Sequence, residues 1–379
     1  MTESIFREFI AKYLRPTVAK IYELINNRPA DAQRPLLHKE MLIEEHTSKD
    51  TWDSTNISRS VVAADVVAMD SSLPLKKRGS FSRATGRIPK LGMKYKKLES
   101  DIKDIQVAMA TGASEAQTVG KLMNDVDSAI KGMEYAKEIM FLRALSTGQT
   151  LVKDEDSDGK GIRVDFGYLE SNTYTVGKKW SDAGATPISD LQVALEGAEE
   201  IGVKPSLMLL SRKAFKRMRT SVEGKQLGAR YQSMVITDPA NLPDPSNSVF
   251  LEALKDELSV DVRVVDSVIP IQKPDGTTTN IRPWEEANVV FVPSNIVGRL
   301  VYGDCVEATN PNKAVEYAKG EQGTLISIYH LSEPSFAEIT AVQAHAIPVI
   351  DGGHQVIVVE TETVTAGSKK ETKAKKERA

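Results

Sequence analysis

The chain of 379 residues is long enough for two domains, and its 41% apolar and 27% charged residues are ordinary for a globular protein. The net charge of −3 argues against a protein that binds polyanions over its whole surface. The single cysteine, Cys305, excludes an internal disulfide and a cysteine zinc cage, and it favours folding in a reducing cytoplasm. No apolar run approaches about 18 residues and no signal-peptide pattern is present, so we expect neither a membrane span nor export.

Residues 1–27 carry two short amphipathic patterns separated by Pro16, and we expect a packed pair of helices. Residues 28–60 have mixed polarity and no regular period, so we expect an extended arm outside the core. Within this arm, Glu44, Glu45 and His46 are typical of a solvated turn.

Residues 58–69 are apolar and β-branched, which predicts a strand, and a strongly basic stretch follows. Nine positive charges and no acid occur in residues 76–97, namely Lys76, Lys77, Arg78, Arg83, Arg87, Lys90, Lys94, Lys96 and Lys97. Glycines and prolines interrupt the stretch, so it predicts a long two-stranded loop that projects from the body. Three interpretations remain open: a solvated loop, phosphate contacts with nucleic acid, and docking on an acidic surface of a neighbouring subunit. Residues 98–110 are expected to return towards the sheet.

Residues 114–145 predict one long helix, because apolar side chains recur every three or four residues. Thirty-two residues would span roughly 48 Å. Ser114 and Gln117 fit a capping box, and Gly148 stands where a helix stop is expected. Gly120 and Gly132 each cost about 1 kcal/mol relative to alanine, which suggests a bend or close backbone approaches. The alternatives are a long core helix of an ordinary two-domain protein and a strut for an elongated shell subunit.

Residues 154–165 (DEDSDGKGIRVD) place four aspartates and a glycine on calcium-loop positions. Position 12 is Asp165, where a bidentate glutamate is usual, and a strand pattern follows in place of the second helix. We therefore expect an acidic hairpin tip without a metal.

Residues 186–295 alternate helix and strand patterns and predict a compact α/β unit. Thr186 and Pro187 begin one helix, and Ser211 caps another. Residues 296–360 are rich in strand patterns, and we expect them to pack back onto the long helix. The final lysine-rich residues are low in complexity and are expected to be disordered.

The sequence contains no dinucleotide fingerprint, no phosphate-binding loop and no nucleophile elbow. The five histidines show no paired spacing, and Cys305 lies in a strand-like run where a buried small apolar residue is the expectation. Nothing in the sequence argues for an enzyme, a cofactor or a metal site.

The order of arm, basic loop, long helix, α/β insert and returning strands resembles the major capsid protein of tailed bacteriophages. This family has the fold named after phage HK97, and the likeness is closest to the lambda-like capsid protein E family. The resembling stretches are GVKPSLMLLSRKAFKRM (residues 202–218), NVVFVPSNIVGRLVYGD (residues 288–304) and HLSEPSFAEITAVQAHAIPVI (residues 330–350). The likeness covers roughly residues 55–360 and concerns order and texture more than diagnostic motifs.

The resemblance implies an α+β fold with a peripheral domain that is interrupted by an α/β axial domain. The implied parts are an N-terminal arm (1–60), the first peripheral part (61–185) with an extended E-loop hairpin (70–98) and a spine helix (114–147), the axial domain (186–295), the second peripheral part (296–362) and a disordered basic tail (363–379).

The resemblance also implies a structural protein, not an enzyme, that self-assembles as hexamers and pentamers into an icosahedral head around double-stranded DNA. It implies scaffold, portal and decoration partners, no membrane, and assembly in the host bacterial cytoplasm into a virion capsid. The predicted inter-subunit contacts of the E-loop are Lys76, Lys77, Arg78, Arg83, Arg87 and Lys90. The alternatives are an encapsulin-like bacterial shell protein and a basic nucleic-acid-binding protein.

Overall fold

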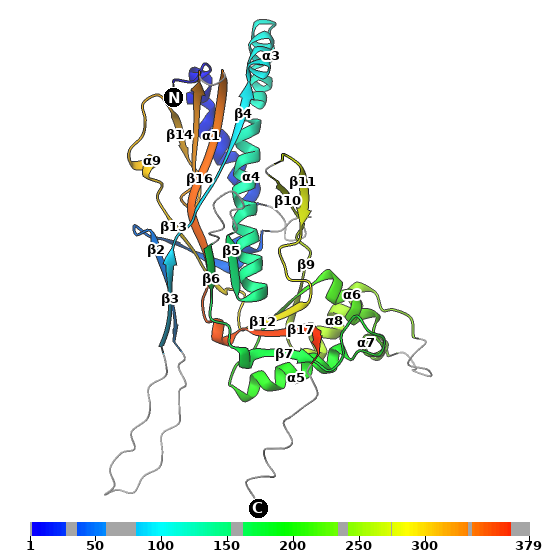
Figure 1. The fold of residues 1–379 in the computed structure, drawn as a ribbon. Coiled ribbons are helices and arrows are strands. Elements are labelled where there is room, and N and C mark those ends of the chain that lie inside the picture. Colours follow the sequence, from blue (N-terminus) through cyan, green and yellow to red (C-terminus); the bar gives the residue numbers. More distant parts are fainter. Residues whose placement is uncertain are drawn as a thin grey trace, which may run out of the picture.

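A computed structural model describes residues 2–27, 36–57, 81–152, 162–233, 242–273, 275–332 and 336–364. The molecule is elongated (Figure 1). A long helix and a six-stranded sheet form one part, and a compact α/β part lies at one end of the helix. A two-stranded hairpin projects beside that end, on the side away from the α/β part.

The long helix α4 (Glu115–Thr147) confirms the predicted element and both of its ends. The Ser114 hydroxyl accepts a hydrogen bond from Gln117 N at 3.3 Å, and the Gln117 side chain accepts one from Ser114 N at 3.1 Å. This capping box satisfies two amides of the first turn. Gly148 ends the helix with φ 72°, a left-handed conformation in which glycine avoids strain.

The six-stranded sheet lies against α4 and is antiparallel except for one pair. Its strands in spatial order are β1 (Leu42–His46), β13 (Gly298–Gly303), β16 (Ala337–Ile350), β15 (Leu325–Leu331) and β14 (Glu316–Lys319), with β4 (Lys90–Leu98) paired to β16. Helix α3 (Glu99–Ala110) continues from β4 and turns back into α4. Residues 98–110, expected to return towards the sheet, are therefore mostly helical.

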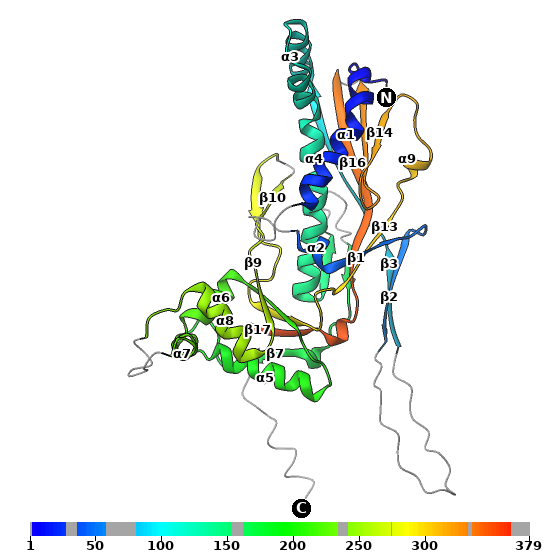
Figure 2. The same cartoon turned by 180° about the vertical axis from the view of Figure 1, so that it is seen from behind.

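Helix α1 (Arg7–Asn26) runs continuously through Pro16, so the predicted pair of helices is wrong. Its buried face includes Ile10, Leu14, Val18 and Ile21, on both sides of the proline. These side chains share one core cluster with α4 and the six-stranded sheet. This packing stabilises the helix across a residue that removes one backbone hydrogen bond. Figure 2 shows α1 crossing α4.

Residues 36–46, predicted to belong to an extended arm outside the core, form α2 (Leu37–Met41) and β1 instead. Leu37, His38 and Met41 are buried. The parallel pairing of β1 with β13 satisfies backbone groups that an arm would leave to solvent. The expected strand at residues 58–69 lies outside the described residues.

The α/β part contains a five-stranded sheet with spatial order β7 (Thr173–Val176), β17 (Ile357–Val364), β12 (Asn288–Val292), β8 (Leu207–Ser211) and β9 (Asp261–Val265). Its helices are α5 (Pro187–Glu200), α6 (Arg212–Thr220), α7 (Val222–Tyr231) and α8 (Asn247–Leu258). Ser211 caps α6 as predicted, accepting from Ala214 N at 3.0 Å. Thr186 makes no side-chain capping bond to α5.

Strand β17 pairs with β12 and β7 in the five-stranded sheet, so the expectation that residues 355–360 pack onto the long helix is confirmed only in part. Its side chains alternate between two cores: Val358 joins the cluster around the end of α4, and Val359 joins the cluster under the α/β helices. The last described strand therefore packs in both cores and connects the α/β part to the rest of the molecule.

Apart from the projecting hairpin, the remaining described elements are short. They are the hairpin β10 (Ile269–Gln272) and β11 (Thr278–Ile281), the strand pair β5 (Gln149–Val152) and β6 (Ile162–Asp165), the helix α9 (Val306–Thr309) and two 3₁₀ turns (Glu170–Asn172 and Gly353–Gln355).

Candidate assembly site: the projecting hairpin and its root

The projecting hairpin is formed by β2 (Thr51–Ile57) and β3 (Phe81–Arg87), which pair from Thr51 opposite Arg87 to Ile57 opposite Phe81. The predicted hairpin over residues 70–98 therefore differs from the observed one in its strands. Its last nine residues form β4 of the six-stranded sheet, and the strand that pairs with β3 is β2, which ends more than ten residues before residue 70. The apolar face of β4, with Leu91, Met93 and Tyr95, explains why this segment joins the core.

The structure separates the six predicted contact residues. Lys76, Lys77 and Arg78 lie outside the described residues. Arg83 and Arg87 belong to β3, where Arg87 is exposed at the base of the hairpin. Lys90 is exposed on β4, opposite His345 of β16.

The remaining lysines of the basic stretch lie on β4 and divide between its two faces. Lys94 and Lys96 are exposed, whereas Lys97 is half-buried and forms an ion pair with Asp125 of α4. Because Lys97 makes a contact within its own subunit, the basic stretch does not form one continuous surface for docking on a neighbour.

Trp52 anchors the root of the hairpin in the core. It is 3% exposed and packs against Phe166, with ring centroids 6.1 Å apart. Gly86 lies opposite on β3, where a Cβ atom would approach the Trp52 Nε1 atom to 2.8 Å. The Trp52 indole therefore lies over a strand position where only glycine fits without movement. At the base, Ile88 N donates to Asp50 O at 3.0 Å.

Arg299 of β13 ties the hairpin root to the sheet. Its guanidinium donates to both carboxylate oxygens of Asp351, at 2.7 and 3.1 Å, and forms an ion pair with Glu45 of β1. It also donates to the backbone oxygen of Asp53 in β2 at 2.9 Å. Hydrogen bonds to Asp351 and then Glu45 raise the pKa of Arg299, which keeps this residue charged.

A buried ionic network joins α4 to segments far away in the sequence. His38, Glu134, Lys137 and Glu138 are each at most 1% exposed. Lys137 Nζ donates to Glu134 Oε1 at 2.9 Å and to Gln322 Oε1 at 2.7 Å. The network holds α2 and residues 320–323 against the middle of the long helix.

The prediction of a solvated turn at Glu44, Glu45 and His46 is wrong, because these residues form strand β1. Glu44 accepts a hydrogen bond from Gln322 Nε2 at 2.8 Å, and His46 lies 3.2 Å from Asp304. Their partners are more than 250 positions away in the sequence, so no local signal could have identified them.

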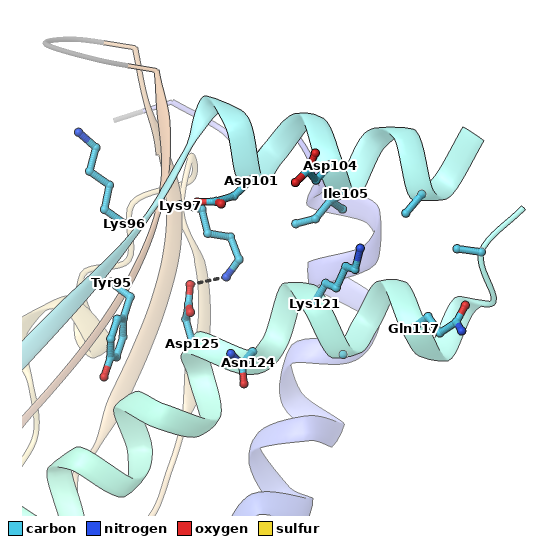
Figure 3. A pocket seen from close by; sticks show the side chains of 13 residues that line it. Tyr95, Lys96, Lys97, Asp101, Asp104, Ile105, Gln117, Lys121, Asn124 and Asp125 are labelled. Carbon is cyan, nitrogen blue, oxygen red and sulfur yellow. Dashed lines mark hydrogen bonds and ion pairs between the residues drawn. The ribbon is translucent and has the colours of Figure 1, made fainter. Parts of the chain in front are cut away.

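A groove of about 870 Å³ lies between β4, α3 and the first turns of α4 (Figure 3). Ile105 lies at its base, and the Lys97–Asp125 ion pair closes one side. Asp104 and Lys121 come from opposite helices, so the groove has no single sign of charge.

No three His, Cys, Asp or Glu side chains within the described ranges are arranged to hold a metal ion. The predicted acidic hairpin tip lies largely outside these ranges, at residues 153–161, and stays a prediction. No helix among the described elements combines the length and apolar character that a membrane span needs. Cys305 is buried, as expected.

No protein-family model and no curated protein matches the sequence. Solved structures do match over nearly the whole chain. A putative capsid protein of a prophage from Escherichia coli CFT073 is 14% identical, with a TM-score of 0.54, over 90% of this chain and 98% of that one. A phage-related protein from Bordetella bronchiseptica RB50 is 12% identical (TM-score 0.48, 92% and 97% covered), and the capsid of cyanophage A-1(L) is 11% identical (0.47, 89% and 96%).

The likeness to the prophage protein covers 90% of this chain and 98% of the other, so it concerns the fold as a whole. The expected α+β fold of the HK97 type is therefore confirmed. The lambda-like capsid protein E family is not distinguished by these matches. The chain has the fold of a phage capsid protein.

Proposed function

We propose that this protein is the major capsid protein of a tailed bacteriophage and that it self-assembles into the icosahedral head around double-stranded DNA. The observation that carries the proposal is the fold, shared with a putative prophage capsid protein along almost the full length of both chains. The role is structural, and it requires no catalytic residue or cofactor.

The shape of the subunit supports this role. The β2–β3 hairpin has no partner strands beyond its own pair among the described elements, and a two-stranded hairpin is at best marginally stable alone in water. Its root is nevertheless fixed in the core by Trp52 and Arg299. A firmly rooted two-stranded projection that pairs only with itself among the described strands suits a contact with a neighbouring copy, since closed shells rely on heterologous contacts.

In this proposal, β2–β3 with its connecting residues is the E-loop, α4 is the spine helix, the six-stranded sheet forms the peripheral domain and the five-stranded sheet the axial domain. The proposed inter-subunit contacts are Lys76, Lys77, Arg78, Arg83, Arg87 and Lys90. Hexamers and pentamers of the chain, scaffold, portal and decoration proteins, and packaged DNA are the proposed partners. The virion capsid is the proposed location, after assembly in the bacterial cytoplasm.

The purified protein should form rings or closed shells without any cofactor. Negative-stain microscopy and light scattering over a range of protein and salt concentrations measure this directly. A single monomeric species under every condition would contradict the proposal, and a monomer that retards DNA in a gel would favour the nucleic-acid-binding alternative. An encapsulin-like shell would be favoured by two results together: regular particles that enclose protein cargo, and particles from infected cells that contain no nuclease-resistant DNA.

The triple variant Lys76→Ser/Lys77→Ser/Arg78→Ser should fold normally and assemble poorly. In this proposal the three side chains contact a neighbouring copy and not the core of their own subunit. Surface substitutions rarely change stability by more than about 0.5 kcal/mol, whereas charge pairs of about 0–1 kcal/mol each add up around a ring of subunits. The measurement is particle yield after nuclease treatment.

A matched control, Lys369→Ser/Lys370→Ser/Lys373→Ser, removes the same charge from the C-terminal tail and should assemble like the unmodified protein. Normal yield of the first variant, together with a weaker salt dependence of DNA binding, would instead assign the basic loop to nucleic acid.

A further inference from the structure

His38 lies between two carboxylates in the buried ionic network. Its Nδ1 atom is 2.7 Å from Glu138 Oε2, and its Nε2 atom is 3.2 Å from Glu134 Oε2. A neutral imidazole has one N–H donor and one bare nitrogen lone pair. With ionised carboxylates on both sides, the neutral ring would direct that lone pair at a negatively charged oxygen. The doubly protonated ring donates to both.

Both carboxylates accept hydrogen bonds from further donors. Glu138 accepts from the backbone amides of Leu37 and His38, at 3.1 and 2.9 Å, which are the first amides of helix α2. Glu134 accepts from Lys137. Burial raises the pKa of Glu134, but Lys137 and His38 outweigh burial and leave that pKa far below its usual range.

The charges of the buried quartet balance only when His38 is protonated. Glu134 and Glu138 then oppose His38 and Lys137, and loss of the ring proton leaves one uncompensated negative charge at sites that are at most 1% exposed. An unpaired buried charge is costly, and removing one partner of a buried pair is strongly destabilising.

Neighbouring groups do not supply the positive charge that is lost when His38 is deprotonated. Lys39 Nζ is 3.5 Å from Glu134 but also pairs with Glu321 at 3.0 Å. From α1, the Tyr22 hydroxyl is buried, and burial and then Glu134 raise its pKa, so it stays neutral. From β1, Glu44 adds a further negative charge, held by Gln322.

We propose that protonated His38 is a pH-sensitive latch, which holds residues 36–46 against the long helix and releases them when the ring loses its proton. The latch consists of the subunit's own contacts and is independent of the capsid proposal. Strand β1 ends five residues before the projecting hairpin begins at Thr51. Opening the latch would therefore release the segment of chain that leads into the hairpin.

The direction of the pH dependence follows from linkage. Burial lowers the pKa of His38, hydrogen bonds to Glu134 and Glu138 raise it, and the net pKa lies above 6.5. A group whose pKa is raised on folding contributes stability that is complete below its unfolded pKa and is lost as the pH rises through its folded pKa. The latch is therefore closed in mildly acidic solution and opens on the alkaline side. Lys137, whose pKa is lowered by burial, acts with the opposite sign in its own range.

Residues 320–323 show that the network constrains the backbone on its other side. Gln322 is 5% exposed and has φ 52°, a left-handed conformation that costs energy for a residue with a side chain. Its amide group bridges Lys137 and Glu44. Opening the latch should therefore loosen residues 320–323 together with residues 36–46.

Hydrogen–deuterium exchange measured by mass spectrometry tests the latch on the full chain, assembled or not. After correction for intrinsic exchange rates, protection of residues 36–46 should fall as the pH rises above 6.5. The total fall should be tenfold for each pH unit by which the folded pKa exceeds 6.5. The His38→Gln variant should show low protection in this segment at every pH. Constant protection of the unmodified protein as the pH rises would overturn the proposal.

Two further variants make the experiment specific. His46→Gln changes a histidine whose side chain is 48% exposed, beside Asp304, and should keep the full pH dependence. Glu138→Gln keeps an acceptor for the α2 amides but removes one negative charge, so the loss of protection should move to lower pH. If His38→Gln fails to fold, Glu138→Gln and the unmodified protein still decide. Loss of the pH dependence in His46→Gln, or an unmoved transition in Glu138→Gln, would reject His38 as the titrating group.

Discussion

The Lys137→Met variant should lose about 3–5 kcal/mol of unfolding free energy, the usual cost of removing one partner from a buried ion pair. Methionine fills similar space, so the loss reports charge rather than a cavity. Lys137 and Glu134 are both fully buried, and the substitution leaves Glu134 without its contact of 2.9 Å and Gln322 without its donor. Denaturant unfolding of the unassembled subunit measures the change.

Lys131 offers a matched control on the same helix. It pairs with Asp127 at 2.6 Å, but both side chains are more than a third exposed. Solvent screens such pairs, so Lys131→Met should change stability by about 0–1 kcal/mol. The double variant Glu134→Gln/Lys137→Met should recover part of the loss, because no buried charge is then left without its partner. A loss below about 1 kcal/mol for Lys137→Met alone would contradict the buried pair.

The sequence predicts the long helix well because its signals are local. Ser114, Gln117 and Gly148 determine the ends through contacts within four residues, and the apolar stripe determines the buried face. The helices and strands of the α/β part follow in the same way, from caps such as Ser211 and from short apolar strands. Elements whose signals lie inside the element itself were therefore predictable.

The same helix also carries buried charged residues whose burial depends on distant segments of the chain. The sequence does not identify Glu134, Lys137 and Glu138 as buried residues, since charged side chains are rarely buried unless paired. Their partners His38 and Gln322 are about 100 and 185 positions away, and nothing local indicates that these segments meet. Strand β17 is a similar case, since its pattern predicts a strand but cannot decide between two sheets that both offer apolar faces.

The hairpin and its root depend on both local signals and long-range contacts. The basic composition predicts a projecting two-stranded element over residues 70–98. Within the described residues only β3 of the hairpin lies in that range, and its pairing depends on β2, a strand that precedes the basic residues. Trp52 stands in a polar strand and gave no sign of being a core residue. Arg299 lies 246 positions from its acceptor in that strand. The composition of a loop is thus evident from its own residues, whereas the long-range contacts that hold its root are not.

The Trp52→Ala variant should lose about 3–5 kcal/mol of stability and should assemble poorly even where the subunit remains folded. Truncating a buried tryptophan removes its packing and leaves a cavity, here among Phe166, Gly86 and Ile88. The hairpin would keep its own ladder but lose the contact that fixes its direction. Denaturant unfolding gives the first effect, and particle yield per folded subunit at low temperature gives the second.

Trp180→Ala separates the role of the root from general destabilisation. Trp180 is 4% exposed, donates to Asp190 at 2.9 Å and packs in the α/β core, away from the hairpin. Its loss should destabilise the subunit by a similar amount, since both indoles are almost fully buried. At a temperature where both variants are folded, Trp180→Ala should give particles and Trp52→Ala should not. Equal yields would show that the direction of the hairpin does not depend on Trp52, and the hairpin contacts would then have to form by adjustment during assembly.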